Sequence, residues 1–157
     1  MINKILVGID DSEHAEKMLR RARELQKNLG SELVVFHSIE HKMIPKSLTL
    51  PRPPFGPASV YRIPQVDYNK LRQEYIDRGK KILEKAAKIV GTDEPKVETR
   101  LITELKPEDY AITVAEKENF DLIMMGQKGD HNILERLIGS VAEKVLYEAK
   151  CDVMIVK

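Results

Sequence analysis

Residues 121–144 read DLIMMGQKGDHNILERLIGSVAEK. A short apolar run follows Asp121 and ends directly at Gly126. Further along, Gly139 precedes Ser140-Val-Ala-Glu143, which has the S-x-x-E pattern of a helix capping box. A strand, a glycine turn and a helix N-terminus together present free backbone N–H groups to an anion. The stretch therefore predicts one strand–helix unit and raises the question of whether its glycines hold a phosphate.

Four more apolar runs occupy residues 4–9, 32–39, 97–102 and 153–156. Each is short and shows little polar alternation, as expected for strands buried on both faces. Helical spacing separates the runs, over residues 12–29 and about 67–90, and in segments that begin near residues 107 and 140. Expected helix signals are an N-cap at Ser12, stops at Gly30 and Gly91, and a first helical residue at Pro107.

The element order is therefore β-α-β-α-β-α-β-α-β, which predicts an α/β fold. Strands joined by helices imply an open five-stranded parallel sheet with right-handed crossovers and helices on both faces. The sequence has no internal repeat or second core, and 157 residues suit a single domain over residues 1–157.

Residues 41–66 interrupt this pattern. The segment carries six of the eight prolines, contains no Asp or Glu, and includes apolar residues such as Phe55 and Tyr61. Loops this long are usually functional or disordered. The segment is too apolar for a plain solvated linker, so we expect it to pack on its own domain or on a partner subunit; the alternative is a surface insertion.

Bulk composition limits the partners. Lys and Arg number 26 and Asp and Glu 25, so no strong net field favours nucleic acid or an acidic membrane. No apolar run reaches the roughly 18 residues of a membrane span, and the N-terminus resembles a first strand more than a signal peptide. The single cysteine, Cys151, fits a reducing, cytoplasmic setting and is interpreted as a small apolar residue.

The familiar phosphate signatures G-x-x-x-x-G-K-[ST] and G-x-G-x-x-G do not occur. The first strand, however, ends in Gly8-Ile-Asp10-Asp11. Carboxylates at a strand end suit ribose hydroxyls or a cation such as Mg²⁺. If the first and fourth long strands are neighbours, Asp10 and Gly126 flank one crevice, with a sugar at one end and a phosphate at the other.

These residues resemble the universal stress protein family. Gly126-x-x-Gly129, nine residues, then Gly139-Ser140 matches the family's ATP-binding pattern G-x2-G-x9-G-[ST]. Residues 5–12, 121–126 and 139–146 are similar to the family's opening strand and turn, fourth strand and last helix. The resemblance covers the chain apart from residues 41–66. It implies a Rossmann-like fold of the adenine nucleotide alpha hydrolase type with strand order 3-2-1-4-5.

The resemblance also implies roles for individual residues. Asp10 would bind the adenosine ribose, the backbone of Ser38 would contact adenine, and the glycines with Ser140 would hold the phosphates. The predicted cofactor-binding residues are Asp10, Ser38, Gly126, Lys128, Gly129, Gly139, Ser140 and Val141.

Simpler interpretations stand beside these roles. Ser140 and Asp10 could each serve only as helix caps. Asp11, where many family members have a small residue, is a cap or a surface acid. Asp130 and Glu135 would repel phosphate unless they pair locally, and Lys128 and Arg136 could offset them. No histidine pair has metal-ligand spacing, and no Ser-His-Asp set can be placed.

Three functions remain open. The first is a regulatory, stress-response homodimer that binds ATP or another adenine nucleotide and acts on a protein partner that the sequence does not identify. The second is a slow ATPase or nucleotidyl transferase, although no general base or Walker lysine is recognisable. The third is a dimerisation module without nucleotide. The dimer is expected through residues 153–157, which would form an exposed apolar edge of the sheet.

Overall fold

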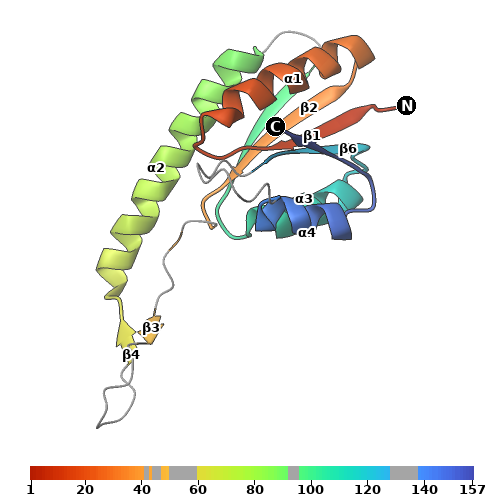
Figure 1. The fold of residues 1–157 in the computed structure, drawn as a ribbon. Helices are drawn as coiled ribbons and strands as arrows, with labels where there is room; N and C mark the ends of the chain where they lie inside the picture. The colour runs from red at the N-terminus through yellow and green to blue at the C-terminus, as the bar shows by residue number, and fades with distance from the viewer. Residues whose placement is uncertain (41–42, 44–46, 50–59, 92–95, 128–137) are drawn as a thin grey trace.

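The computed structural model describes residues 1–40, 43, 47–49, 60–91, 96–127 and 138–157 (Figure 1). The elements are β1 (Lys4–Gly8), α1 (His14–Leu29), β2 (Glu32–Ser38), β3 (Ser47–Thr49), β4 (Val60–Arg62), α2 (Gln65–Val90), β5 (Val97–Ile102), α3 (Pro107–Lys117), β6 (Leu122–Gly126), α4 (Ser140–Glu148) and β7 (Asp152–Val156). The five long strands, α1 and α2 lie within one or two residues of the bounds that the sequence predicts, and α3 and α4 begin at the predicted residues Pro107 and Ser140.

All long strands belong to one parallel sheet with the order β5-β2-β1-β6-β7. Counting long strands only, this is the predicted order 3-2-1-4-5. Along the sequence, strands β1, β2 and β5 are added toward one edge of the sheet, and β6 and β7 are then added on the other side of β1. The strand order therefore reverses between β1 and β6, whose ends are in register at Gly8 and Met125.

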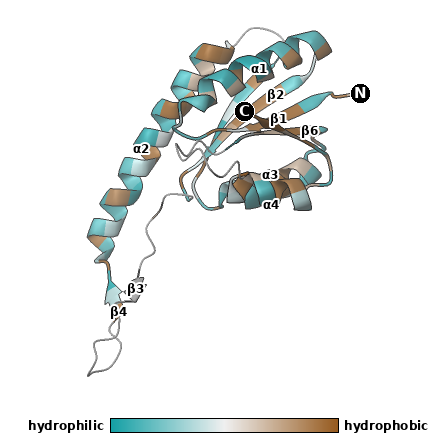
Figure 2. Cartoon of the chain, in the orientation of Figure 1, coloured by the Kyte–Doolittle hydropathy of each residue, from teal (hydrophilic) through white to brown (hydrophobic). Residues whose placement is uncertain are grey.

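Each face of the sheet has its own apolar core. Ile5 and Val7 of β1 join a cluster with α1 and α2, whereas Leu6 joins a second cluster with α3 and α4. Because both faces are covered, β1 is apolar at consecutive positions, as Figure 2 shows for the strands. The helices in the described ranges carry polar outer faces, and none is both long and apolar enough to cross a membrane.

The start of α1 corrects one prediction. Ser12 was predicted as the N-cap, but the helix begins at His14, and Glu13 occupies the cap position without a side-chain hydrogen bond. The Ser12 N–H instead donates to Oδ1 of Asp10 at 3.1 Å, while the Ser12 carbonyl accepts the Ala15 N–H at 3.2 Å. The Asp10 carboxylate thus holds a turn before the helix, which is a common role for aspartate.

Strands β3 and β4 form a two-stranded antiparallel ribbon at the N-terminal end of α2, away from the main sheet (Figure 1). Val60 and Tyr61 are 59% and 52% exposed. The described side chains of β4 are therefore exposed and do not pack on the domain's own core. Most of residues 41–66 lie outside the described residues, so packing of this segment on its own domain or on a partner subunit stays a prediction.

The backbone of β1 lies unusually close to its neighbours at Gly8. A Cβ added there would lie 2.7 Å from the Met125 sulfur and 2.9 Å from Cζ of the buried Phe36 ring. At Gly126, by contrast, the one described atom that an added Cβ would meet is the Met18 sulfur, at 3.9 Å. Among the described residues, packing therefore requires glycine at position 8 but not at position 126.

We expect Gly8→Ala to lower the free energy of unfolding by about 1–3 kcal/mol, because the added methyl overpacks a rigid core. Gly126→Ala is the matched control and should stay within about 0.5 kcal/mol of the wild type. Urea unfolding monitored by circular dichroism measures both. Equal effects from the two variants would contradict the packing argument.

A cluster of ionic side chains ties the edge of the sheet to α3. Arg100 of β5 donates to Glu118 at 2.7 and 3.0 Å, to Glu98 at 2.7 and 3.2 Å, and to the Tyr110 hydroxyl at 3.2 Å. Lys4 of β1 reaches the same Glu118 at 3.1 Å. Hydrogen bonds from Arg100, with a smaller contribution from Lys4, lower the pKa of Glu118 to about 2.

This cluster makes stability depend on pH. The folded-state pKa of Glu118 lies below its ordinary value of 4.5, so its stabilisation is complete above pH 4.5 and is lost as the pH falls toward 2. The difference in unfolding free energy between wild type and Glu118→Gln should therefore be largest at pH 7 and should shrink as the pH falls toward 2. Urea unfolding across this range measures it, with the exposed acid variant Glu24→Gln as control. A difference independent of pH would contradict the assignment.

Candidate functional site

A cavity of about 320 Å³ lies beyond the carboxyl ends of β1, β2 and β6. Its wall includes Asp10, Ser38 and Gly126, together with Gly139, Ser140 and Val141 from the start of α4. In an open parallel sheet, a crevice opens where the strand order reverses, because the two connections leave toward opposite faces. The β1–β6 pair is that position here, so the fold brings together six of the eight predicted binding residues.

The other two, Lys128 and Gly129, lie outside the described residues, as do Asp130, Glu135 and Arg136. Their predicted phosphate contacts and charge effects therefore stay predictions.

Asp10 lies at the end of β1, and its side chain is exposed at the cavity. One carboxylate oxygen accepts the Ser12 N–H, which fixes the turn that carries the acid. This hydrogen bond precedes α1 and does not cap it. The turn holds Asp10 at the cavity, where a carboxylate can accept hydrogen bonds from hydroxyl groups.

Ser38 is the last residue of β2 and is buried. Its hydroxyl donates to the Leu105 carbonyl at 2.6 Å and accepts the Glu40 N–H at 3.3 Å. The hydroxyl therefore holds together the segments that follow β2 and β5. Contact with a ligand through the Ser38 backbone, as the sequence resemblance implied, is compatible with this arrangement and is not tested by it.

The start of α4 corrects a second prediction. Ser140 was predicted as the N-cap of a capping box with Glu143, but Gly139 occupies the cap position in an extended conformation and makes no side-chain cap. The first intrahelical bond runs from the Glu143 N–H to the Gly139 carbonyl at 2.9 Å. The N–H groups of Ser140, Val141 and Ala142 precede this bond, and the three residues line the cavity. A helix N-terminus of this kind attracts an anion.

Gly126 ends β6 opposite this helix start. The next residue, Gln127, donates its N–H to the Val156 carbonyl at 2.9 Å and continues the pairing with β7. Since packing does not demand glycine at position 126, its effect is to leave the strand backbone open toward the cavity. A ligand group can therefore approach the main chain closely here.

Sequence reasoning missed the wall that α2 supplies. Tyr75, Arg78 and Ile82 line the cavity from this helix, and Arg78 forms an ion pair with Asp11. The sequence predicts a helix over about residues 67–90 but does not indicate which of its residues face a site. No local signal places Arg78 at the site, because 67 residues separate it from Asp11.

The described part of the wall has a simple charge inventory. Asp10 and Asp11 are its carboxylates, Arg78 is its one lysine or arginine, and His14 and His37 are its imidazoles. Nδ1 of the buried His37 lies 2.9 Å from the Ile9 carbonyl and carries a proton, since a carbonyl can only accept. Across the described ranges, no three His, Cys, Asp or Glu side chains are grouped as a metal site would require.

An open α/β sheet with its cavity at the point of strand reversal defines a class of small-ligand-binding proteins. Within that class, the chain belongs to the universal stress protein family, whose sequence model matches residues 1–157. Curated relatives include universal stress protein MJ0577 of Methanocaldococcus jannaschii, 29% identical over 100% of this chain and 96% of its own length. Universal stress protein YxiE of Bacillus subtilis is 30% identical, with full coverage of both chains.

Solved structures agree with this assignment. The structure of MJ0577 superposes with a TM-score of 0.75 at 26% identity, covering 100% of this chain and 96% of the other. A universal stress protein from Archaeoglobus fulgidus, solved in complex with dAMP, superposes with a TM-score of 0.64 at 26% identity and full coverage of both chains. These similarities confirm the predicted family and fold class.

Proposed function

We propose that this protein binds ATP or another adenine nucleotide in the cavity at the β1–β6 strand ends, and that it acts as a regulatory, stress-response protein of the cytoplasm. The observation that carries the proposal is the convergence of Asp10 with Ser140 and Val141 at one cavity, where the first N–H groups of α4 have no hydrogen-bond acceptor among the described residues. A sugar and a phosphate need these two kinds of group.

The shape and chemistry of the cavity support the proposal. Its volume of about 320 Å³ lies in the range of small-molecule sites. The side chains of Ile39, Tyr75, Ile82 and Pro107 supply the apolar part of the wall that a purine requires. The dAMP complex of the Archaeoglobus fulgidus relative adds support from a protein of the same family.

Adenine would lie beside Ser38, the ribose beside Asp10, and the phosphates between Gly126 and the start of α4, with Lys128 and Gly129 completing the phosphate site. Any Mg²⁺ would arrive bound to the phosphates, since this ion keeps most of its water and takes few protein ligands. If a protein carboxylate contacts this Mg²⁺, we expect it to be Asp10, because Asp11 already pairs with Arg78.

Binding without fast turnover fits the site better than catalysis. Phosphoryl transfer needs cations that neutralise the developing charge and a group that orients the nucleophile. In the described part of the cavity wall, Arg78 is the one lysine or arginine, so a single cation serves the phosphates there. We therefore assign the site to ligand-dependent regulation.

Isothermal titration of the purified protein with ATP, ADP and AMP tests the function. We expect binding to the wild type, and a loss of affinity of about ten-fold or more in Asp10→Ala, because a charged hydrogen bond to the ribose is removed. Asp67→Ala removes an exposed acid of α2 that does not line the cavity and should leave affinity unchanged. No heat with any nucleotide at millimolar concentration would favour a dimerisation module without nucleotide.

We further propose that the protein is a homodimer joined through β7. Among the described strands, β7 lies at the edge of the sheet and pairs with β6 alone, and its side chains from Val153 to Val156 are half-buried in the single chain. The Asp152 N–H and the Val156 carbonyl bond toward β6, so by alternation the backbone groups of Val153 and Ile155 point to the open edge. Exposed apolar edges are normally paired or covered.

Sedimentation equilibrium tests the dimer. The wild type should be dimeric at micromolar concentration, whereas Ile155→Pro should be monomeric, because proline removes an N–H that points to the open edge and leaves the bonds to β6 in place. Met154→Pro is the control for position: its N–H points inward, so this change should weaken the fold itself. A wild type that is monomeric at micromolar concentration would contradict the dimer.

A further inference from the structure

An arginine from α2 reaches an acid at the rim of the proposed nucleotide cavity. Nε of Arg78 lies 2.9 Å from Oδ2 of Asp11, and Nη2 contacts the same oxygen. The two side chains are 59% and 39% exposed. Both residues line the cavity, so this ion pair connects α2 with the β1–α1 turn at the cavity's edge.

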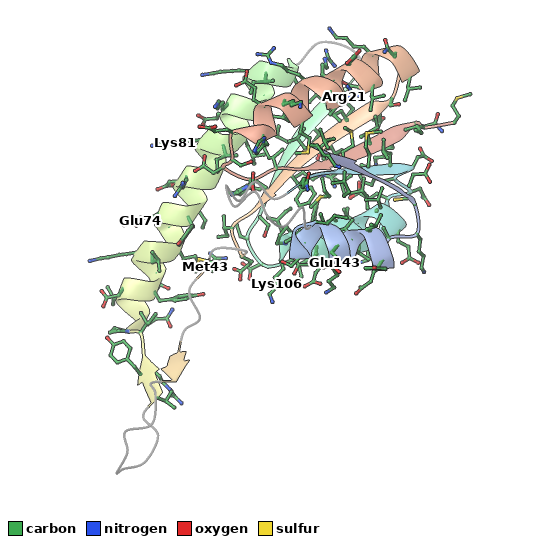
Figure 3. All side chains as sticks on the ribbon, in the orientation of Figure 1. Arg21, Met43, Glu74, Lys81, Lys106 and Glu143 are labelled. Carbon is green, nitrogen blue, oxygen red and sulfur yellow. The ribbon has the colours of Figure 1, made fainter. Side chains whose placement is uncertain are left out.

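The packing of α2 explains how Arg78 comes to lie there. The next residue, Gly79, is buried, and a Cβ on it would lie 2.6 Å from Cδ1 of Leu101 and 3.1 Å from Cδ2 of His37. The helix can approach β2 and β5 this closely because Gly79 has no side chain. Figure 3 shows Lys81, on the same helix, directed away from the sheet. Position 78 instead faces the cavity.

The ion pair affects the net charge that the cavity wall presents to a ligand. In the described part of the wall, Arg78 is the one lysine or arginine, and Asp10 and Asp11 are both acids. Asp10 has a proposed partner in the ribose, but Asp11 would repel a phosphate chain unless a cation neutralised it. An exposed ion pair of this kind contributes little to stability, so its effect on a charged ligand outweighs its effect on folding.

We propose that the Arg78–Asp11 ion pair is a charge selector, which sets how strongly nucleotide affinity depends on the number of phosphates. Arg78 compensates Asp11 in the free protein and offers its remaining N–H groups to the ligand's phosphates. Asp11 competes with the phosphates for the same guanidinium, which limits the preference for the triphosphate. This inference rests on the proposed nucleotide site and identifies two residues that control its specificity.

The effect should be graded. Because the rim is solvated, removing one protein charge should change nucleotide affinity by about two- to five-fold for each phosphate charge that lies within a Debye length of it. Adenosine, which carries no phosphate, should be unaffected. A purely structural ion pair would instead change the binding of all ligands equally.

The test measures the affinities of adenosine, AMP, ADP and ATP for each variant by isothermal titration. Arg78→Gln should lower ATP affinity by about ten-fold or more and change adenosine affinity less than two-fold. Asp11→Asn should raise ATP affinity several-fold, and the double variant should fall between the two. Arg78→Lys keeps the charge and should retain most of the preference for ATP.

Lys81→Gln is the matched control, because it removes the same charge from the exposed side of α2 and should leave all four affinities unchanged. The differences between variants should shrink in about 0.5 M NaCl, since salt screens an exposed charge. Circular dichroism and urea unfolding establish that each variant is folded.

Two results would overturn the selector. One is an equal change for adenosine and ATP in Arg78→Gln, which would mark a structural ion pair. The other is unchanged affinities in both Arg78→Gln and Asp11→Asn, with ATP bound normally by the wild type. If the wild type binds none of the four ligands, the proposed nucleotide site fails and the selector fails with it.

Discussion

The parallel pairing of β1 with β6 is the constraint on which the rest of the molecule depends. The register at Gly8 and Met125 places the strand ends side by side, and the connections that leave them turn to opposite faces of the sheet. The cavity is the space between those connections. The β1–α1 turn and the start of α4 are far apart in sequence and meet only because of this pairing.

Close backbone approach shapes the site as much as the side chains do. Gly8 lets the end of β1 lie against Phe36 and Met125, and Gly79 lets α2 lie against the strands on the other side. Both glycines are required by packing, and both determine what lines the cavity. Gly126 differs, because no described residue packs tightly against it, which leaves its backbone open to a ligand on that side.

The sequence was a good predictor of what short-range patterns control. Apolar runs separated by helical spacing predicted the strands and helices, because burial on both faces leaves a continuous apolar signal. Strand order came from family resemblance. Both predicted N-caps, Ser12 and Ser140, were wrong, because Glu13 and Gly139 occupy the cap positions instead. Arg78 escaped prediction, since only the tertiary packing of α2 brings it to the site.

Amide hydrogen exchange with and without ATP tests the central claim most directly. The N–H groups of Ser140, Val141 and Ala142 precede the first hydrogen bond of α4, so they should exchange fast in the free protein. If the cavity is an adenine nucleotide site, ATP should slow exchange there and in the β1–α1 turn around Asp10, while the ribbon of β3 and β4 stays unchanged. Unaltered exchange at the start of α4 under saturating ATP would contradict the account.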